Sequence, residues 1–212
     1  MSSPTTNCPS CGAPVTFRWS GAIQTVCPFC HSILVRTDVA LQNVGKVADL
    51  PPDPSPIQLL TSGTYNNKRF DVLGRIIYEY DQGGWNEWHI VFSDGTSGWL
   101  SDAQLQYAVS FLVSGVQLPA DSAVFRGQHF NFCNIDFEVS VITAATYKGM
   151  EGELPFPFYN IKHTRFADLR SRADDFATLD YSYQGTPVLY VGKTVAYESL
   201  HLQNIRQFEG WA

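Results

Sequence analysis

From residue 58 onward, apolar and polar residues alternate in short stretches, the pattern of β-strands that have one buried face. In residues 69–80 the alternating apolar members are Phe70, Val72, Ile76, Tyr78 and Tyr80. Residues 87–93 and 97–100 are the next two predicted strands, and Asp94-Gly95 between them is typical of a tight hairpin turn. The pattern therefore predicts a meander of antiparallel strands.

A second stretch loosely repeats the first. Residues 127–139 and residues 63–72 both start at a glycine and lead into a long strand. This faint repeat predicts two related β modules, residues 58–115 and 120–212. A last strand is expected at residues 188–192, and a short helix or strand at residues 196–208. Whether the two modules share one core is left open by the sequence.

The first 37 residues contain two Cys-x-x-Cys pairs separated by fifteen residues: Cys8, Cys11, Cys27 and Cys30. This spacing is typical of a zinc ribbon, in which a hairpin brings the pairs together and four thiolates complete a tetrahedral site. Such a closed site has no open position for water. We therefore expect one structural Zn²⁺, and we interpret the neighbouring His31 as a bystander.

Three short strands are expected in the ribbon, at residues 15–19, 24–26 and 32–37, with Phe17, Trp19 and Ile33 covering the metal. Two other uses of the cysteines have less support. Disulfides need an oxidising compartment, yet residues 1–7 are polar and lack the apolar core of a signal peptide. A thioredoxin-like motif would open a helix, whereas the proline in each pair places it in a tight turn. We expect a cytoplasmic protein.

Residues 38–57 are interpreted as a linker. Its first part, residues 38–50, is amphipathic and predicts a short helix, although Gly45 weakens it. The following Leu-Pro-Pro-Asp-Pro-Ser-Pro run favours an extended, polyproline-like spacer. The expected fold class is therefore mainly β: a zinc ribbon (residues 1–37), a proline-rich linker (residues 38–57), and a double β-barrel or sandwich-like module (residues 58–212).

The charge argues against nucleic acid as a partner. The chain has 212 residues and a formal net charge of −6, which four thiolates and one Zn²⁺ would take to about −8. Phosphate backbones require a basic face, and the ribbon contains only two arginines and no lysine. No apolar run reaches the ~18 residues of a membrane-spanning helix, so no transmembrane segment is expected; indirect membrane association stays open.

Three tryptophans, Trp85, Trp88 and Trp99, cluster with Glu87 around a predicted hairpin. They are a candidate groove for a peptide or a cationic ligand, because aromatic faces and a carboxylate attract cations. The favoured alternative is that the aromatic residues fill the core and that Glu87 caps a turn.

Paired carboxylates are the second candidate. Glu151 and Glu153 would lie on one face of a strand, exposed if that face is solvated, and carboxylate pairs can perform acid–base catalysis. An acidic edge for a basic partner is the alternative.

Cys133, with His129 and His163, is a conceivable nucleophile pair, but a small buried hydrophobic residue is the preferred interpretation. Asp180 and Ser182 make a still weaker triad. No residue is nominated as catalytic, and none as cofactor-binding beyond the four metal ligands.

Several segments resemble a known family, the bacterial domain of unknown function 4178. They are SPIQLLTSGTYNNKRFDVLGRIIYEY (residues 55–80), GWNEWHIVFSDGTSGWLSD (84–102), EGELP (151–155), FATLDYS (176–182) and YVG (190–192). The resemblance extends over nearly the whole region after the linker, and family members often carry an N-terminal zinc ribbon. It implies no assigned activity or catalytic residue. Relatives tend to be encoded beside membrane-associated stress and scaffold proteins or polyamine-synthesis enzymes, which implies an accessory or adaptor part.

The sequence therefore favours a zinc-binding, non-enzymatic interaction or adaptor protein with a protein partner. Two alternatives remain: a carboxylate-dependent hydrolase or transferase, and a nucleic-acid-associated zinc-ribbon factor. The oligomeric state is not predicted.

Overall fold

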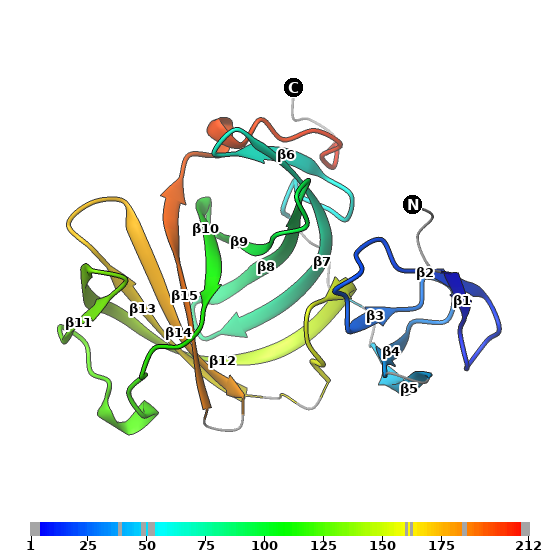
Figure 1. The fold of residues 1–212 in the computed structure, drawn as a ribbon, viewed down its shortest axis with the longest axis horizontal. Helices are drawn as coiled ribbons and strands as arrows, with labels where there is room; N and C mark the ends of the chain where they lie inside the picture. The colour runs from blue at the N-terminus through cyan, green and yellow to red at the C-terminus, as the bar shows by residue number, and fades with distance from the viewer. Residues whose placement is uncertain are drawn as a thin grey trace.

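The structure is a computed structural model that describes residues 5–37, 40–47, 50, 54–159, 161, 163–183 and 186–208. These residues are mainly β, as expected, with a large sheet that partly closes into a ring. Figure 1 shows the N-terminal strands at one end of the molecule and the remaining strands in a larger body beside them. Within the described ranges, no helix has the length and apolar character needed to cross a membrane.

The N-terminal unit contains five strands. They are β1 (Thr5–Asn7), β2 (Pro14–Thr16), β3 (Gln24–Val26), β4 (Ser32–Arg36) and β5 (Leu41–Lys46). β1 and β2 form a separate two-stranded sheet, whereas β3, β4 and β5 are consecutive neighbours in the large sheet. The strand predicted at residues 24–26 is present as β3, and those predicted at residues 15–19 and 32–37 are present in shorter form as β2 and β4. β1 and β5 were not predicted.

The short helix predicted within residues 38–50 is wrong, because Leu41–Lys46 forms the antiparallel strand β5 against β4. Ile33 pairs with Gly45 and Leu34 pairs with Asn43, so Val44 lies between two paired positions and forms an irregularity in the register. Pairing with β4 and packing of Val44 against the main body outweigh the weak helical periodicity. Residues 38, 39, 48, 49 and 51–53 lie outside the described residues, and with them three of the seven residues of the predicted proline-rich spacer.

The next five strands form the predicted antiparallel meander. They are β6 (Ser62–Tyr65), β7 (Lys68–Tyr80), β8 (Gly83–Phe92), β9 (Ser97–Ala103) and β10 (Gln106–Val113). The hairpin predicted at Asp94-Gly95 is confirmed: Gly95 has a φ of 85°, and its N–H donates to the carbonyl of Phe92 at 2.8 Å. A 3₁₀ turn η1 (Asp121–Ala123) follows the meander.

The second half repeats this strand order. Its strands are β11 (His129–Phe132), β12 (Ile135–Leu154), β13 (His163–Arg170), β14 (Asp175–Tyr183) and β15 (Thr186–Val195), with the 3₁₀ turn η2 (Tyr197–Leu200) after them. Each half therefore has a short strand, a very long strand and three further strands. That the halves are related, and that the chain divides at residues 37, 57 and 120, stays a prediction.

Two seams join the halves. β7 pairs with β12, and β10 pairs with β15, so that β7–β10 and β12–β15 make a closed circuit of hydrogen-bonded strands. Glycines allow the close approach at both seams. A Cβ atom on Gly152 would lie 2.1 Å from the carbonyl oxygen of Leu73, and one on Gly192 would lie 1.8 Å from that of Val109.

The buried side chains of the described residues form separate hydrophobic clusters. One face of the first meander packs into its own core around Phe70, Trp88, Ile90, Leu100 and Val109. The second meander has a separate core around Phe137, Val139, Leu169, Leu179 and Leu189. A third cluster combines both halves and the ribbon, with Ile33, Ile76, Tyr78, Trp99, Met150, Phe158 and Phe166. Each half thus keeps its own core, and the two share a third.

Candidate metal centre and interior cavity

The four ribbon cysteines come together in the folded chain. Their sulfur atoms all lie within 4.8 Å of one another, with 3.7 Å between Cys8 and Cys30 and 3.8 Å between Cys11 and Cys27. Four ligands at ~2.3 Å around a tetrahedral Zn²⁺ are about 3.8 Å apart. The sulfur spacing therefore suits a metal ion of this size, and a set of four thiolates suits a soft divalent metal.

The two Cys-x-x-Cys turns share one backbone design. In the first, Gly12 donates its N–H to the carbonyl of Cys8, and in the second His31 donates to the carbonyl of Cys27, at 2.8 and 3.0 Å. Both donors have left-handed backbones, with φ of 76° and 58°. The second turn thus places a histidine where the first has glycine. In this second turn, hydrogen bonds with Ser32 lower the pKa of the Cys30 thiol to about 6.

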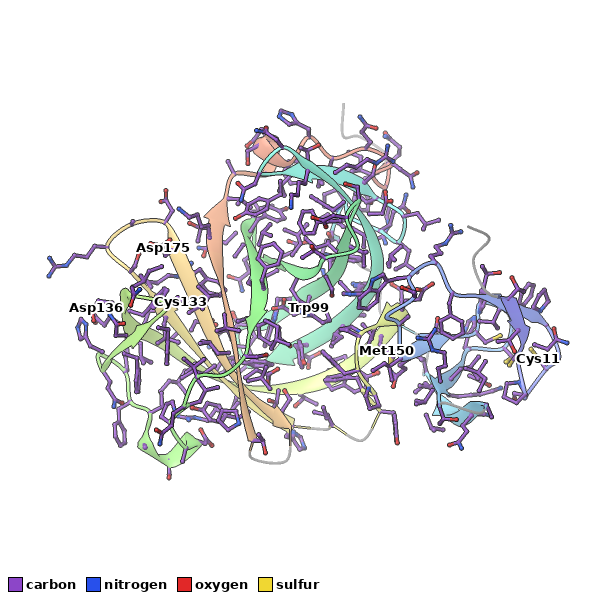
Figure 2. The ribbon with its side chains drawn as sticks, viewed as in Figure 1. Cys11, Trp99, Cys133, Asp136, Met150 and Asp175 are labelled. Carbon is purple, nitrogen blue, oxygen red and sulfur yellow. The ribbon has the colours of Figure 1, made fainter. Side chains whose placement is uncertain are left out.

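The aromatic cover of the metal site is only partly as predicted. Phe17 and Trp19 pack in the cluster that contains the buried Cys8 and Cys27. Ile33 points instead into the cluster shared with the main body. Figure 2 shows the sulfur atoms around Cys11 at the outer end of the ribbon, far from Trp99 near the middle of the molecule.

Glu153 attaches the ribbon to the main body. It is 5% exposed, and its two carboxylate oxygens accept the backbone N–H groups of Arg18 and Trp19 at 2.7 and 3.0 Å. Burial raises the pKa of its carboxyl group, although these two amides favour the charged form. The end of β12 also pairs with β3 (Glu153 with Thr25). Glu153 is therefore a structural anchor, and the solvated face on which it would have been exposed is not found at this residue.

A buried histidine, His89, contacts the backbone of Glu153. The Nδ1 atom of His89 lies 2.8 Å from the carbonyl oxygen of Glu153, and its Nε2 lies 2.8 Å from Oγ of Ser97. Burial lowers the pKa of His89 to about 4, so the ring is neutral at physiological pH. Trp19 packs against this ring with centroids 5.1 Å apart. The anchor thus extends from the ribbon to β8.

The candidate tryptophans separate onto two faces of β8 and β9. Trp88 lies in the core of the first meander, with the guanidinium of Arg75 4.8 Å from its ring centre. Trp85, Glu87 and Trp99 line a cavity of about 300 Å³ between the two meanders. Trp88 thus fills a core as expected, whereas Trp85 and Trp99 pack in the third cluster and also border the cavity. That these residues bind a peptide or a cationic ligand stays a prediction.

Two further carboxylates face this cavity from the second meander: Asp168 on β13 and Asp180 on β14. Burial raises the pKa of all three acids, to about 8 for Glu87, and the charges of Asp168 and Asp180 add to the effect at Glu87. Glu87 accepts hydrogen bonds from Trp85 Nε1 at 2.9 Å and Ser101 Oγ at 2.7 Å. It is thus a partly buried acid on β8, and the expectation that it caps a turn is wrong.

The model of the family described as Domain of unknown function (DUF4178) matches residues 60–196, more than half of the chain. The chain belongs to the DUF4178 family. No curated protein and no solved structure matches it. The DUF4178 region begins at β6 and ends at β15, so the whole strand circuit and the cavity belong to it, whereas the four cysteines precede it.

The other candidate catalytic residues of the DUF4178 region, Glu151 and the pair Asp180 and Ser182, form contacts within the fold. Glu151 forms an ion pair with the buried Arg75 at 3.1 Å. Asp180 accepts hydrogen bonds from both the N–H and Oγ of Ser182. Because Gly152, which separates the two glutamates, has a left-handed φ of 65°, Glu151 is left partly exposed while Glu153 is buried.

Cys133 is exposed, not buried as expected. It begins the turn between β11 and β12, where Cys133 and Asn134 both have left-handed backbones. His129 contacts Asp136 at 3.0 Å, and His163 contacts Thr146 at 3.3 Å. Figure 2 places Cys133 beside Asp136 at the end of the molecule opposite Cys11.

The sequence interpretation missed Asp168, His89 and the anchoring role of Glu153. A signal exists for Asp168, which interrupts the apolar strand Phe-Ala-Asp-Leu, as Asp180 interrupts Leu-Asp-Tyr. An acidic residue inside an apolar strand indicates a polar interior site. The contacts of His89 and Glu153 join strands far apart in sequence, and no local pattern indicates them.

Proposed function

We propose that this DUF4178 protein is a non-enzymatic, cytoplasmic adaptor in which one structural Zn²⁺ shapes a ribbon that docks a protein partner. The four clustered thiols support zinc, since four-thiolate sites are closed and structural. They also support a reducing compartment, where thiols stay available to a metal. Membrane-associated stress or scaffold systems are the proposed setting of the partner.

The observation that carries the proposal is the anchoring of the ribbon on the DUF4178 region. Glu153 binds two ribbon amides, and β12 continues into the ribbon sheet through β3. Gln24 adds a reciprocal pair of contacts with the backbone of Phe158, at 2.7 and 3.2 Å. A ribbon held in this way presents its metal end at a fixed position, which lowers the entropic cost of docking.

One side chain is suited to contact a partner. Phe29, between the cysteines of the second Cys-x-x-Cys pair, is 64% exposed. Large aromatic residues contribute strongly to binding when a partner covers them, and a metal-bound turn would hold this ring in place. The docking surface of the proposal is therefore the exposed face of the second cysteine turn.

The alternatives have less support. A carboxylate-dependent hydrolase or transferase would need free acids at residues 151 and 153, yet Glu151 pairs with Arg75 and Glu153 holds the ribbon. A nucleic-acid factor would need a basic face, which the net charge of −6 opposes. DNA or RNA binding with a steep salt dependence would favour the latter.

The proposal is tested by affinity purification of the tagged full-length protein from its native host, with quantitative mass spectrometry. The Phe29→Ser variant is compared with Leu105→Ser, which removes another exposed apolar side chain, 80% exposed, from the β9–β10 turn. We expect a stoichiometric partner whose recovery falls at least about tenfold with Phe29→Ser alone. Equal recovery from both variants would exclude the cysteine turn as the docking surface.

A further inference from the structure

We propose that the cavity between the two meanders binds a small organic ammonium ion, with Glu87, Asp168 and Asp180 as its anionic partners and aromatic rings as its walls. This goes beyond the adaptor role and does not depend on the metal. The chemical class follows from the shape, the walls and the charges of the cavity.

The cavity has the form of a ligand site. Its volume is about 300 Å³, at the lower end of the ~300–1,000 Å³ of small-molecule pockets. Tyr80, Gln104, Gln106 and Thr194 line one end, where the β7–β8 and β9–β10 turns lie and where three of these four residues are exposed. The buried Trp99 and Tyr78 lie further in. A small ligand can therefore enter from the turn end and lose most of its water.

The aromatic walls are fixed by contacts among themselves. The rings of Tyr78 and Trp85 stack with centroids 4.9 Å apart, and Phe166 meets both edge-on at 5.0 and 5.5 Å. Trp99 packs on Phe156 at 5.8 Å. Rings held in this way present a preorganised electron-rich surface that attracts ammonium groups. This cation–π attraction is strongest when the cation is desolvated.

The charges of the wall also favour a cation. Three carboxylates line the cavity, and Arg170 is the positively charged side chain among the described residues that line it. The Arg170 guanidinium lies 4.5 Å from the ring centre of Phe176 and offsets part of the charge of Asp168. The recorded hydrogen bonds of the carboxylates come from neutral donors: Trp85, Ser101, Thr178 and Ser182. Carboxyl groups that a cation can bring to the charged form therefore outnumber the positively charged side chain of the wall by three to one.

A cation would relieve the cost of keeping these acids in the interior. Glu87 faces Tyr78, Asp168, Asp180 and Tyr190 as well as its two donors, and its pKa of about 8 keeps it largely protonated at neutral pH in the empty cavity. An ammonium ion favours the carboxylate form, so Glu87 gives up its proton as the cation binds. Affinity should then rise with pH up to about 8.

The first test uses cations and matched neutral molecules. The intact, zinc-loaded protein is titrated by calorimetry with choline and with butylammonium, and in parallel with 3,3-dimethylbutan-1-ol and pentane, which have similar shapes without the charge. We expect saturable binding of at least one cation and at least about tenfold weaker binding of its neutral counterpart. No binding of either cation at millimolar concentration, or equal binding of the neutral molecules, would overturn the proposal.

Variants locate the site. Glu87→Gln keeps the shape of the side chain and removes its charge, whereas Glu138→Gln makes the same change on an exposed part of β12. We expect about tenfold or greater loss of cation affinity for Glu87→Gln and no change for Glu138→Gln. A Trp85→Leu variant gives a second readout from the aromatic wall. Unchanged affinity in both cavity variants would place the cation elsewhere and refute the site.

Proton release separates this mechanism from simple attraction. At pH 7, the binding enthalpy should differ between phosphate and Tris buffers in proportion to their ionisation enthalpies, corresponding to release of up to one proton. Glu87→Gln should remove most of this difference. Cation binding without proton release in the unaltered protein would contradict the assigned role of Glu87.

Discussion

The anchoring of the ribbon by Glu153 leads to the most direct test of the fold. In Glu153→Ala the β12 backbone and its pairing with β3 can persist, because they use main-chain atoms. The variant removes only the two acceptors that the N–H groups of Arg18 and Trp19 use. Any effect on the ribbon therefore reports on this carboxylate.

The expected magnitude follows from the hydrogen bonds. Each bond to a charged group contributes about 1.5–3 kcal/mol, and a buried donor left without a partner costs about 1–3 kcal/mol. Burial of the carboxylate, which also raises the pKa of Glu153, offsets part of this gain. We expect a net loss of about 2–4 kcal/mol in the free energy of unfolding for Glu153→Ala. Glu153→Gln should lose less, because its amide oxygen can still accept one of the two bonds.

The assay combines urea unfolding with amide spectra of ¹⁵N-labelled protein. Urea midpoints give the change in stability, and the resonances of Arg18 and Trp19 report the two bonds directly. Glu138→Ala on the same strand is the control, because Glu138 is 58% exposed and its contact with His129 is a surface ion pair, worth about 0–1 kcal/mol. A Glu153→Ala protein within about 0.5 kcal/mol of the parent, with unmoved Arg18 and Trp19 amides, would refute the anchor.

Three further predictions concern the metal, a seam and the cavity. Cys8→Ser combined with Cys11→Ser should unfold the ribbon, because structural zinc supplies the folding energy of such units; retained amide dispersion for residues 5–37 without metal would contradict this. Gly192→Ala should destabilise the β10–β15 seam by about 1–3 kcal/mol or more through overpacking. The loss should exceed that of Gly115→Ala, where the surroundings are open and only the left-handed φ of 79° opposes the change; equal unfolding midpoints would contradict the close packing of the seam. Glu87 has a pKa of about 8 in the fold against an ordinary value of 4.5, so the folded state keeps its proton to higher pH than the unfolded chain does. Stability should therefore fall as pH rises from about 4.5 to 8, by up to ~1.4 kcal/mol per pH unit; a Glu87→Gln protein with an equally steep profile would assign the effect to other groups.

Local patterns in the sequence predict much of this fold. The spacing of the cysteines places four sulfur atoms together, and period-two alternation finds β7, β8 and β9 with their Asp94-Gly95 turn. These features depend on residues close in the chain. The strand at Leu41–Lys46 was missed because its apolar spacing also suits a helix, and pairing with β4 decides between them.

Long-range pairing is the part that one sequence does not reveal. The β7–β12 seam brings Gly74 beside Gly152, and the β10–β15 seam brings Ser110 beside Gly192. Neither contact is reflected in the spacing of apolar residues along the chain, yet together the two seams close the strand circuit and create the cavity. The role of Glu153 is likewise absent from the local sequence, where its acidic side chain is compatible with catalysis. Its two hydrogen bonds join it to ribbon amides that are distant in the chain.

The most direct test of the central claim, that the ribbon holds one Zn²⁺ through four thiolates, is zinc X-ray absorption on the purified chain with metal content measured in the same sample. We predict one zinc per chain and a first shell of four sulfur atoms at ~2.3 Å. A first shell containing nitrogen or oxygen would contradict the four-cysteine site. So would a properly folded ribbon without stoichiometric metal.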